Sequence, residues 1–344
     1  MKRILFLTNG HGEDLVAAEI SRQLEKDFAV STLSLVEKTS PSGGFSFRNL
    51  KFLFRDISAG LIGNTFKNFR LLKDLRDKVD LTIAVGDIVP IIGALLVKAP
   101  FIFVGVNKSD YYQSFGSRYT PWEKWLLKKY AQNIYVRDHL TKENLNKEGI
   151  PAEYVGNPLM DCFEHNQPEI RNSQFETIGF LPGTREDAKL NLEDFEKVVE
   201  ELLALKKPDT YFKFMIATTL PDIPEYMERK TFGEVLAGSD LIVGLSGTGN
   251  EQAAGCGLPV VSFYGRGSQY NASFALAQKQ LLGGSLKLIK ARDHRTIAAA
   301  VWNLINSPDM MSEMGRTGQE RMGEGGAAQI ISAKIKILCS KINT

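Results

Sequence analysis

The sequence lacks most features that mark secreted, metal-binding or membrane-spanning proteins. It has only three cysteines in 344 residues, at positions 162, 256 and 339, with no CxxC pair and no Cys/His cluster that could supply four metal ligands. This pattern favours free, mostly buried thiols in a reducing cytosol. The apolar run that follows Met1-Lys2-Arg3 is too short for the core of a signal peptide.

One apolar stretch, Ile88–Val106, is long enough to raise the question of a membrane span. Pro90, Gly93, Lys98 and Pro100 interrupt it. We therefore expect a buried helix followed by a buried strand, and no spanning segment.

The sequence also lacks a charge excess of either sign. Its 42 Lys and Arg residues nearly balance 40 Asp and Glu residues, which leaves a net charge of +2 and gives no global indication of nucleic-acid binding. The basic residues are unevenly spread, because the segment from Phe45 to Arg76 carries seven Lys or Arg and two Asp, a local charge of +5.

Short apolar runs alternate with helical patterns along the chain. The runs are mostly continuous, which is typical of parallel strands buried on both faces. Repeated βα units of this kind predict an α/β protein with doubly wound parallel sheets. We expect helices at Asp14–Lys26 and Asn191–Leu205 and strands at Arg3–Thr8, Ala29–Val36, Leu81–Val85, Phe101–Val106, Asn133–Val136, Ala152–Val155, Thr177–Leu181, Tyr211–Ala217, Leu241–Leu245, Val260–Phe263 and Leu286–Ile289.

The length of the chain indicates two domains, at about 150 residues each. The segment with the weakest pattern, His165–Ser173, is polar and contains Pro168, and we place the linker there. We therefore expect one domain at residues 1–164, a second at 174–318, and a helical tail at 319–344 that packs near their junction. Ligands of open α/β sheets bind at the carboxyl ends of the strands, so the cleft between two such domains is the expected place for chemistry.

The first loop of interest joins the opening strand to the first helix, and it consists of Asn9, Gly10, His11, Gly12, Glu13 and Asp14. Its glycines permit a tight turn and the close approach of a ligand. Two carboxylates at the helix N-terminus oppose a phosphate there. We interpret the loop as a site for hydroxyl groups, with His11, Glu13 or Asp14 as acceptor or base. The alternative is that the acids only cap the helix.

Two loops in the second half have residues suited to a diphosphate. The weaker pattern, Gly183-Thr184-Arg185, offers backbone N–H groups, a hydroxyl and a guanidinium, but it also fits an ordinary polar turn. The more specific one, Ser246-Gly247-Thr248-Gly249, lets amides close on phosphate oxygens at a helix N-terminus. Its alternative is a turn kept small for helix–strand packing. Arg266 adds a cation near the same edge.

Four motifs follow one another along the chain. They are Gly10-His11-Gly12-Glu13-Asp14-Leu15, Val155-Gly156-Asn157-Pro158-Leu159-Met160-Asp161, Leu181-Pro182-Gly183-Thr184-Arg185, and Ser246-Gly247-Thr248 with Pro259-Val260-Val261. In this order they resemble the lipid A disaccharide synthase group of GT-B glycosyltransferases, and most closely its lipid-A-disaccharide-synthase-related branch. The resemblance covers nearly the whole chain.

The resemblance implies two Rossmann-like domains facing a central cleft, a UDP-sugar held mainly by the C-terminal domain and a lipid-linked acceptor at the N-terminal one. It also implies inversion at the anomeric carbon without a metal or other cofactor. By position, Asp87 matches an aspartate of the synthase pattern and is the favoured base, with His11 second; a helix N-cap before Pro90 is the alternative for Asp87. Arg185 and the amides of residues 246–249 would stabilise the departing diphosphate.

The sequence departs from the family pattern at two positions. The glutamate that would bind the ribose hydroxyls is Gln252 here, with Glu251 beside it, so either Glu251 takes that role or the ribose is recognised differently. We place Asn250, Glu251 and Gln252 at the nucleotide-sugar site. Asn157 replaces the histidine of the VGHP motif.

Basic and aromatic residues are interleaved in a segment that would suit the headgroup region of an anionic bilayer. The expected contacts are Phe47, Arg48, Lys51, Phe52, Phe54 and Arg55. A second candidate runs from Tyr111 through Trp122 and Trp125 to Tyr130, with aromatic residues of the kind found at interfaces. The alternative for both segments is that the rings pack inside the first domain while the cations form a solvated face.

The sequence thus predicts an inverting, metal-independent glycosyltransferase that moves a sugar from a UDP-sugar to a membrane-associated glycolipid acceptor. It would be cytoplasmic and peripherally attached to the inner face of the membrane, with no nucleic-acid partner. Two alternatives stay open. One is a UDP-sugar 2-epimerase, which shares the two-domain architecture and needs several acids but no lipid. The other is a catalytically silent paralogue that binds nucleotide or lipid, to which Gln252 points.

Overall fold

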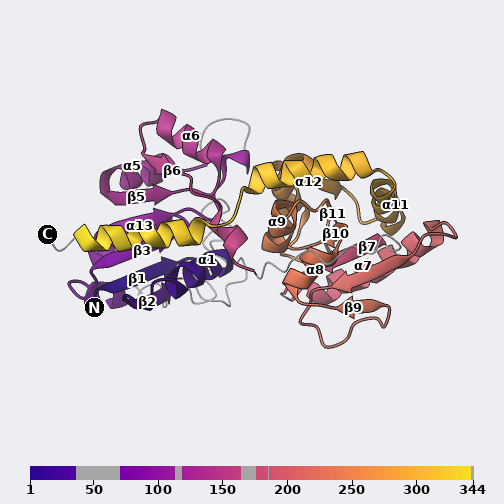
Figure 1. Cartoon of the computed structure of the whole chain (residues 1–344), viewed down its shortest axis with the longest axis horizontal. Helices are drawn as coiled ribbons and strands as arrows, with labels where there is room; N and C mark the ends of the chain where they lie inside the picture. The colour runs from indigo at the N-terminus through magenta and orange to yellow at the C-terminus, as the bar shows by residue number, and fades with distance from the viewer. Residues whose placement is uncertain (36–69, 113–117, 164–175, 185, 342–344) are drawn as a thin grey trace. The chain divides into compact units, whose positions relative to one another are not determined.

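The computed structural model describes residues 1–35, 70–112, 118–163, 176–184 and 186–341. The chain forms two compact units (Figure 1): unit 1 is Met1–Cys162 with Glu324–Thr344, and unit 2 is Phe163–Gly323. Three features that the sequence singled out lie outside the described residues. They are the expected linker at residues 165–173, Arg185, and the basic aromatic segment that contains residues 47–55.

Unit 1 is built on a sheet of six parallel strands in the order β2-β1-β3-β4-β5-β6. β3 and β4 are buried along their whole length, as continuous apolar runs predict for strands covered on both faces. The strands are β1 (Arg3–Thr8), β2 (Ala29–Ser34), β3 (Leu81–Val85), β4 (Phe101–Val104), β5 (Ala131–Tyr135) and β6 (Ala152–Glu153).

Helices cover both faces of this sheet. The strand order runs one way from β1 to β2 and the other way from β3 to β6, so right-handed crossovers place α1 opposite α4, α5 and α6. The apolar stretch Ile88–Val106 forms α4 and then β4, which confirms the expected buried helix and strand. Among the described helices none is long and apolar enough to cross a membrane. The helices are α1 (His11–Arg22), α4 (Ile88–Val97), α5 (Pro121–Tyr130) and α6 (His139–Lys147), with short 3-10 turns η2 (Asp110–Tyr112) and η3 (Pro158–Asp161).

Unit 2 repeats the architecture with six parallel strands in the order β12-β11-β10-β7-β8-β9. Phe180 and Phe195 meet at the centre of its core, with ring centroids 5.2 Å apart. The strands are β7 (Glu176–Leu181), β8 (Phe212–Ile216), β9 (Met227–Arg229), β10 (Leu241–Gly244), β11 (Val260–Phe263) and β12 (Leu286–Ile289). The helices are α7 (Ala188–Leu205), α8 (Phe232–Gly238), α9 (Gly247–Gly255), α10 (Ala272–Leu282), α11 (His294–Ile305) and α12 (Pro308–Met322), with a 3-10 turn, η4 (Gly283–Ser285).

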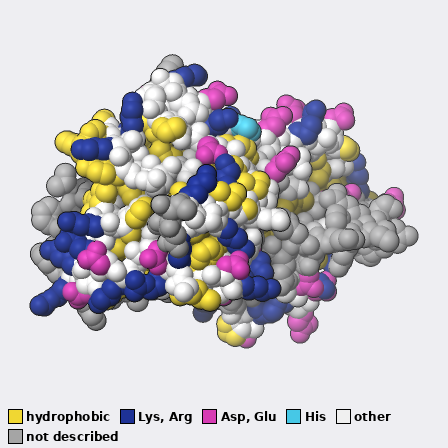
Figure 2. Space-filling view, turned by 60° about the vertical axis from the view of Figure 1, so that its left-hand side comes forward, with side chains coloured by type: hydrophobic (Ala, Val, Ile, Leu, Met, Phe, Trp, Pro, Cys, Tyr) yellow, Lys and Arg dark blue, Asp and Glu magenta, His cyan; other side chains and the backbone are white. Residues whose placement is uncertain are grey.

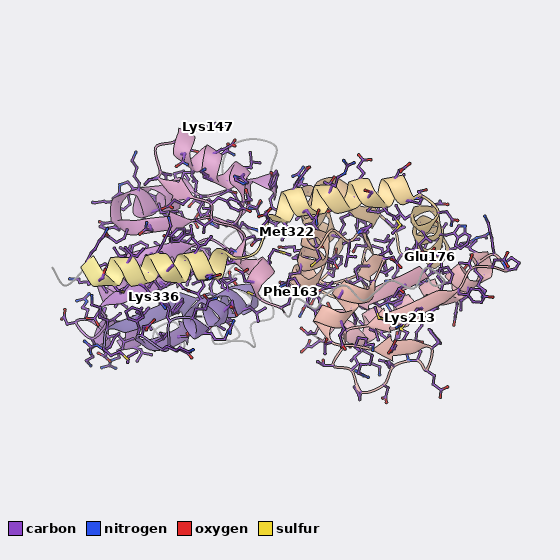
Figure 3. All side chains as sticks on the ribbon, in the orientation of Figure 1. Lys147, Phe163, Glu176, Lys213, Met322 and Lys336 are labelled. Carbon is purple, nitrogen blue, oxygen red and sulfur yellow. The ribbon has the colours of Figure 1, made fainter. Side chains whose placement is uncertain are left out.

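The last two helices belong to different units. α12 lies against α9 in unit 2, and the absence of a side chain at Gly318 permits this, because a Cβ there would lie 2.2 Å from the Ala254 carbonyl oxygen. α13 (Ala327–Lys341) lies in unit 1, where it contacts α1. Figure 3 labels Met322, the last residue of α12, and Lys336 on α13, whose ammonium lies 2.6 Å from the Asp27 carboxylate.

The expected tail at residues 319–344 is therefore not one element. Gly323, with φ +73°, ends α12, and Gly326, with φ +89°, precedes α13. Asp161 accepts hydrogen bonds from the backbone N–H groups of Gly326 and Ala328, the second at 2.7 Å. These bonds fix the start of α13 on unit 1.

Candidate functional site

In unit 2 the two central strands end in the two loops that the sequence proposed for a diphosphate. The chain leaves β7 towards β8 and β9 and returns on the other side of β7 at β10. In open α/β sheets, ligands bind outside the carboxyl ends of the strands at such a reversal. The Leu245 N–H donates to the Leu181 carbonyl oxygen at 2.9 Å, so the two strands stay paired up to the loops.

The two loops lie side by side. A Cβ at Gly183, whose φ is +83°, would be 3.6 Å from the Leu245 carbonyl oxygen. A Cβ at Gly249 would be 2.7 Å from Ser246 Oγ and 3.4 Å from the side chain of Leu181. Any larger residue at Gly249 would therefore push against the loop that begins the helix.

The first turn of α9 presents backbone N–H groups at this edge. Ser246 is its N-cap, and the Ser246 hydroxyl accepts the N–H of Gly249 at 3.2 Å. The N–H groups of Gly247 and Thr248 have no partner within an α-helix, because the first turn has no preceding carbonyls. The turn carries no acidic residue. Its partial positive charge is therefore available to an anion.

In unit 1 the carboxyl ends of β1, β3 and β4 bring together a cluster of acids and amides. The Asn9 side-chain amide donates to Asp87 at 2.9 Å, and the Asn107 amide donates to the Glu13 carboxylate. Thr8 donates its hydroxyl to Asp14 at 2.5 Å. β1 and β3 are neighbours at which the strand order reverses, so this cluster also lies at the expected ligand position.

Burial changes the acidity of this cluster. Glu13 is 3% exposed, and burial raises its pKa to about 7, with a further rise from the carboxylates of Asp87 and Asp14. Burial also raises the pKa of Asp87, against the opposing effects of the Val89 N–H and the Lys108 ammonium. A carboxyl group with a pKa near neutrality can take or release a proton at physiological pH.

Solved structures match this architecture over the whole chain. The calicheamicin glycosyltransferase CalG4 is 16% identical with a TM-score of 0.62 over 100% of both chains. MnaA of S. aureus, in a structure with UDP, is 16% identical with a TM-score of 0.59 over 100% of this chain and 98% of its own. UDP-GlcNAc 2-epimerase from Neisseria meningitidis, bound to UDP-GlcNAc, is 16% identical with a TM-score of 0.52 over 97% of this chain and 100% of its own.

The chain has the GT-B fold. This confirms the expected fold class of two Rossmann-like domains. No protein-family model matches the sequence, and no curated protein matches it.

Within this fold, Asn250 holds the carboxyl end of β10 in place. Its buried amide lies within hydrogen-bond distance of the Gly244 carbonyl oxygen (3.1 Å), the Tyr270 hydroxyl (3.2 Å) and Gln278 Oε1 (2.9 Å). Gln278 in turn donates to the Gly247 carbonyl oxygen at 2.7 Å. The structure thus uses the Asn250 amide nitrogen to support the loop, and the expected contact of Asn250 with the nucleotide stays a prediction.

The two positions that depart from the family pattern, residues 252 and 157, are buried as well. Glu251 and Gln252 are 8% and 4% exposed on α9, so neither lies on an open surface of unit 2. Asn157 is fully buried in unit 1, where it caps η3 by accepting the N–H of Leu159 at 3.1 Å. The structure thus gives Asn157 a local structural role, and the choice between Glu251 and Gln252 for the ribose stays a prediction.

Arg266 contacts α7. Its guanidinium lies 2.9 Å from the Glu193 carboxylate and 3.1 Å from that of Asp194, and it donates to the Leu190 carbonyl oxygen at 2.6 Å. Two carboxylates therefore already match its charge. We assign Arg266 to positioning the loop after β11, and its direct contact with a phosphate stays a prediction.

The sequence overlooked Asn107. This residue follows β4 closely, and a polar residue just after a buried strand is the signal that could have identified it.

The predicted N-cap role of Asp87 is present, since Asp87 accepts the Val89 N–H at 2.9 Å. Its other carboxylate oxygen accepts from Asn9, so capping does not exclude a chemical role. His11 begins α1, but its side chain lies outside what the structure describes.

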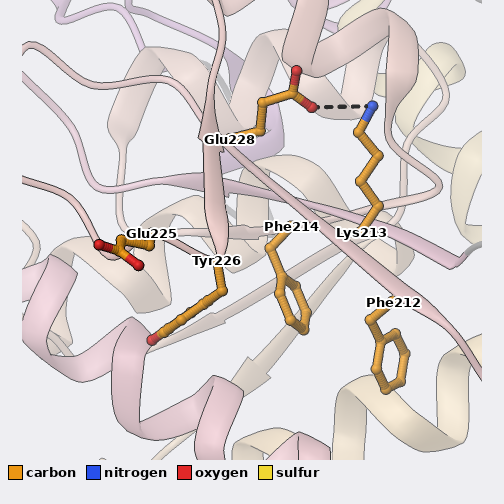
Figure 4. Close-up of a pocket in the computed structure, with 6 residues that line it drawn as sticks. All are labelled: Phe212, Lys213, Phe214, Glu225, Tyr226 and Glu228. Atoms are coloured by element: carbon orange, nitrogen blue, oxygen red, sulfur yellow. Dashed lines mark ion pairs between the residues drawn. The ribbon is translucent and has the colours of Figure 1, made fainter.

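A pocket of about 350 Å³ lies elsewhere in unit 2 (Figure 4). Phe212 and Phe214 stack in it with centroids 5.7 Å apart, and Lys213 pairs with Glu228 at 3.1 Å. These residues belong to β8 and to the edge strand β9, and no residue of the candidate site lines the pocket. We assign no function to it.

Proposed function

We propose that this protein is an inverting glycosyltransferase that transfers a sugar from a UDP-sugar to a lipid-linked acceptor without a metal ion. The observation that carries the proposal is the contrast between two strand-end sites. In unit 2, the amides at the start of α9 have no acid in the same turn. In unit 1, the strand ends carry two carboxyl groups with raised pKa values, the buried Glu13 and the partly buried Asp87.

The site in unit 2 suits the leaving group. As the bond between the anomeric carbon and the diphosphate oxygen breaks, negative charge develops on the UDP. The N–H groups of Gly247 and Thr248, the helix dipole and the Arg185 guanidinium would stabilise that charge. Carboxylates at the same place would repel the negative charge on the UDP, and the first turn of α9 has none.

The site in unit 1 suits the acceptor. The acceptor hydroxyl oxygen would attack the anomeric carbon from the face opposite the diphosphate, which inverts the configuration, and its proton would pass to a carboxylate. Asp87 and His11 were the leading candidates for the base. The raised pKa of Glu13 and its hydrogen bond from Asn107 make Glu13 the stronger candidate for the base, with Asp87 as the second carboxylate of the site.

Epimerisation of a UDP-sugar at C2 is the second candidate. Two observations favour it: structures similar in fold include UDP-GlcNAc 2-epimerases, and unit 1 supplies two acids with raised pKa values that could exchange a proton with a sugar carbon. The reactions differ in their requirement for an acceptor. Incubation with UDP-GlcNAc alone should leave the sugar unchanged in a transferase and produce the epimer in an epimerase.

The test of the proposed function is UDP binding and sugar transfer by matched variants. Arg185→Ala should weaken UDP binding about tenfold, through loss of a charged hydrogen-bond donor. Glu13→Gln should leave UDP affinity unchanged and abolish transfer. Arg316→Ala, an exposed arginine on α12, is the control and should change neither. Unchanged UDP affinity and transfer in Arg185→Ala would contradict the proposal.

A further inference from the structure

Helix α5 of unit 1 presents three large aromatic side chains to solvent. The chain has three tryptophans, and two of them are on this helix: Trp122 is 75% exposed and Trp125 is 48% exposed, with Tyr130 at 39%. The rings contact one another edge to face, with centroids 6.4 Å apart for the tryptophan pair and 5.9 Å apart for Trp125 and Tyr130. Exposed aromatic residues in such a group indicate a binding surface rather than scattered surface residues.

The helix that carries these side chains is held in place on unit 1. Thr120 and Glu123 form a capping box at its start, with Pro121 at the first helical position. Leu127 and Glu123 are fully buried, which anchors the opposite side of the helix to unit 1. Little backbone conformational entropy would therefore be lost when the exposed rings bind.

The charge around these rings is positive. The acid of α5, Glu123, points inward and pairs with Lys108, while Lys124 pairs at 2.6 Å with Glu148, the C-cap residue of α6. Lys129 lies over the rings of Trp125 (4.8 Å) and Tyr130 (5.1 Å). Within the described part of the chain no carboxylate forms an ion pair with Lys128 or Lys129.

We propose that this surface, the α5 face (Trp122, Trp125, Lys128, Lys129 and Tyr130), docks on an anionic lipid bilayer. Tryptophan and tyrosine favour the headgroup level, where the ring is in an apolar layer and its polar edge is hydrated. Lysines beside them attract anionic lipids. Figure 2 brings the unit 1 side of the molecule forward and shows hydrophobic side chains lying among Lys and Arg there. Charge complementarity thus selects an anionic lipid surface as the occupant.

The same helix is connected to the acidic cluster of unit 1. Lys108, the partner of Glu123, is next in sequence to Asn107, which binds Glu13, and Lys108 lowers the pKa of Asp87. A bilayer at the α5 face would therefore lie on the same unit as the proposed acceptor site. Docking itself does not require the proposed reaction, whereas delivery of a lipid-linked acceptor rests on it.

The test uses the full chain and vesicles without any sugar nucleotide. Wild-type protein should bind vesicles of phosphatidylcholine with phosphatidylglycerol more tightly than vesicles of phosphatidylcholine alone. Trp122→Ser with Trp125→Ser should weaken binding by about tenfold or more, and Lys128→Gln and Lys129→Gln by about fivefold each. Tyr211→Ser removes an equally exposed aromatic that also lies beneath a lysine, in unit 2, and should have no effect.

Tryptophan fluorescence identifies the surface that enters the bilayer. Brominated phosphatidylglycerol should remove the same fluorescence intensity from the wild type and from Trp302→Phe, because Trp302 packs in unit 2 against Phe212. Trp122→Phe with Trp125→Phe should lose the quenching. Vesicle binding without quenching, unchanged binding of the double serine variant, or a protein dimer that this variant dissociates would each overturn the proposal. UDP affinity, measured separately, reports on the proposed function.

Discussion

The Glu13 side chain packs against the bare Cα of Gly86: a Cβ at Gly86 would lie 2.9 Å from Glu13 Cγ and 3.1 Å from its Oε1. Gly86 follows β3 with φ +127°, a conformation that other residues rarely adopt. Gly86→Ala should therefore displace Glu13 and strain the backbone. We expect a loss of stability of about 1–3 kcal/mol and a large loss of activity, measured by denaturant unfolding and by sugar transfer.

A variant at a second glycine separates the effect of backbone strain from the effect of displacing Glu13. Gly326 also has a positive φ, +89°, but no atom lies within 4 Å of the position of its Cβ. Gly326→Ala should lose stability through strain alone and retain activity. Equal activities of the two alanine variants would contradict a functional contact between Gly86 and Glu13.

Stability should depend on pH through Glu13. Its pKa is about 7 in the folded chain against an ordinary value of 4.5. Between these values the folded protein keeps a proton that the unfolded chain has lost, so the contribution of Glu13 to the free energy of unfolding falls as pH rises. The full change is about 3 kcal/mol.

Glu13→Gln removes this titration. The variant should gain stability relative to the wild type as pH rises from about 4.5 to about 7, in denaturant unfolding at a series of pH values. Transfer by the wild type should rise over the upper part of the same range, because a base must be ionised. Parallel stability curves for the two proteins would show that Glu13 has an ordinary pKa.

The buried polar network below α9 should be a stability element. The Tyr270 hydroxyl donates to Gln278 at 2.6 Å and accepts from Ser262 at 2.8 Å. Tyr270→Phe removes one hydrogen bond from each of these buried groups, which should cost about 1–3 kcal/mol in the free energy of unfolding. Tyr226→Phe, at a tyrosine that is 48% exposed, is the control and should change little; an equal loss in both would contradict the network.

Arg266 and Arg185 should differ in what their loss impairs. Arg266 pairs with Asp194, which is 1% exposed, so Arg266→Gln leaves a buried carboxylate short of a partner and should lower stability by about 1–3 kcal/mol. Its effect on UDP affinity should be smaller than the roughly tenfold loss expected for Arg185→Ala. Calorimetric titration with UDP and unfolding measurements on both variants check this. A greater loss of UDP affinity in Arg266→Gln than in Arg185→Ala would indicate that Arg266 contacts the phosphates.

Much of the fold is visible in the sequence, because buried parallel strands require continuous apolar runs. Four strands have the predicted limits, and the other runs differ by a few residues at their ends; the four are Arg3–Thr8, Leu81–Val85, Val260–Phe263 and Leu286–Ile289. β9 was missed because its three residues, Met227–Arg229, contain only one apolar side chain. Helix α13 was expected near the domain junction, and its packing on unit 1 depends on distant contacts such as those of Asp161.

The candidate site was partly predictable for a similar reason. Loops after buried strands are easy to find, and the structure brings Gly183 beside Leu245 as the strand order requires. Which polar side chains are used within a unit is set by three-dimensional packing. Asn250 and Arg266 both suited a nucleotide in sequence. In the structure the Asn250 amide lies beside a carbonyl, a tyrosine and a glutamine, and the Arg266 guanidinium pairs with two carboxylates.

The central claim concerns where a diphosphate binds, and a crystal structure with UDP tests it most directly. The account predicts diphosphate oxygens accepting hydrogen bonds from the N–H groups of Gly247 and Thr248, at the start of α9. UDP bound at any other place, such as the loop that contains Glu13, would contradict it.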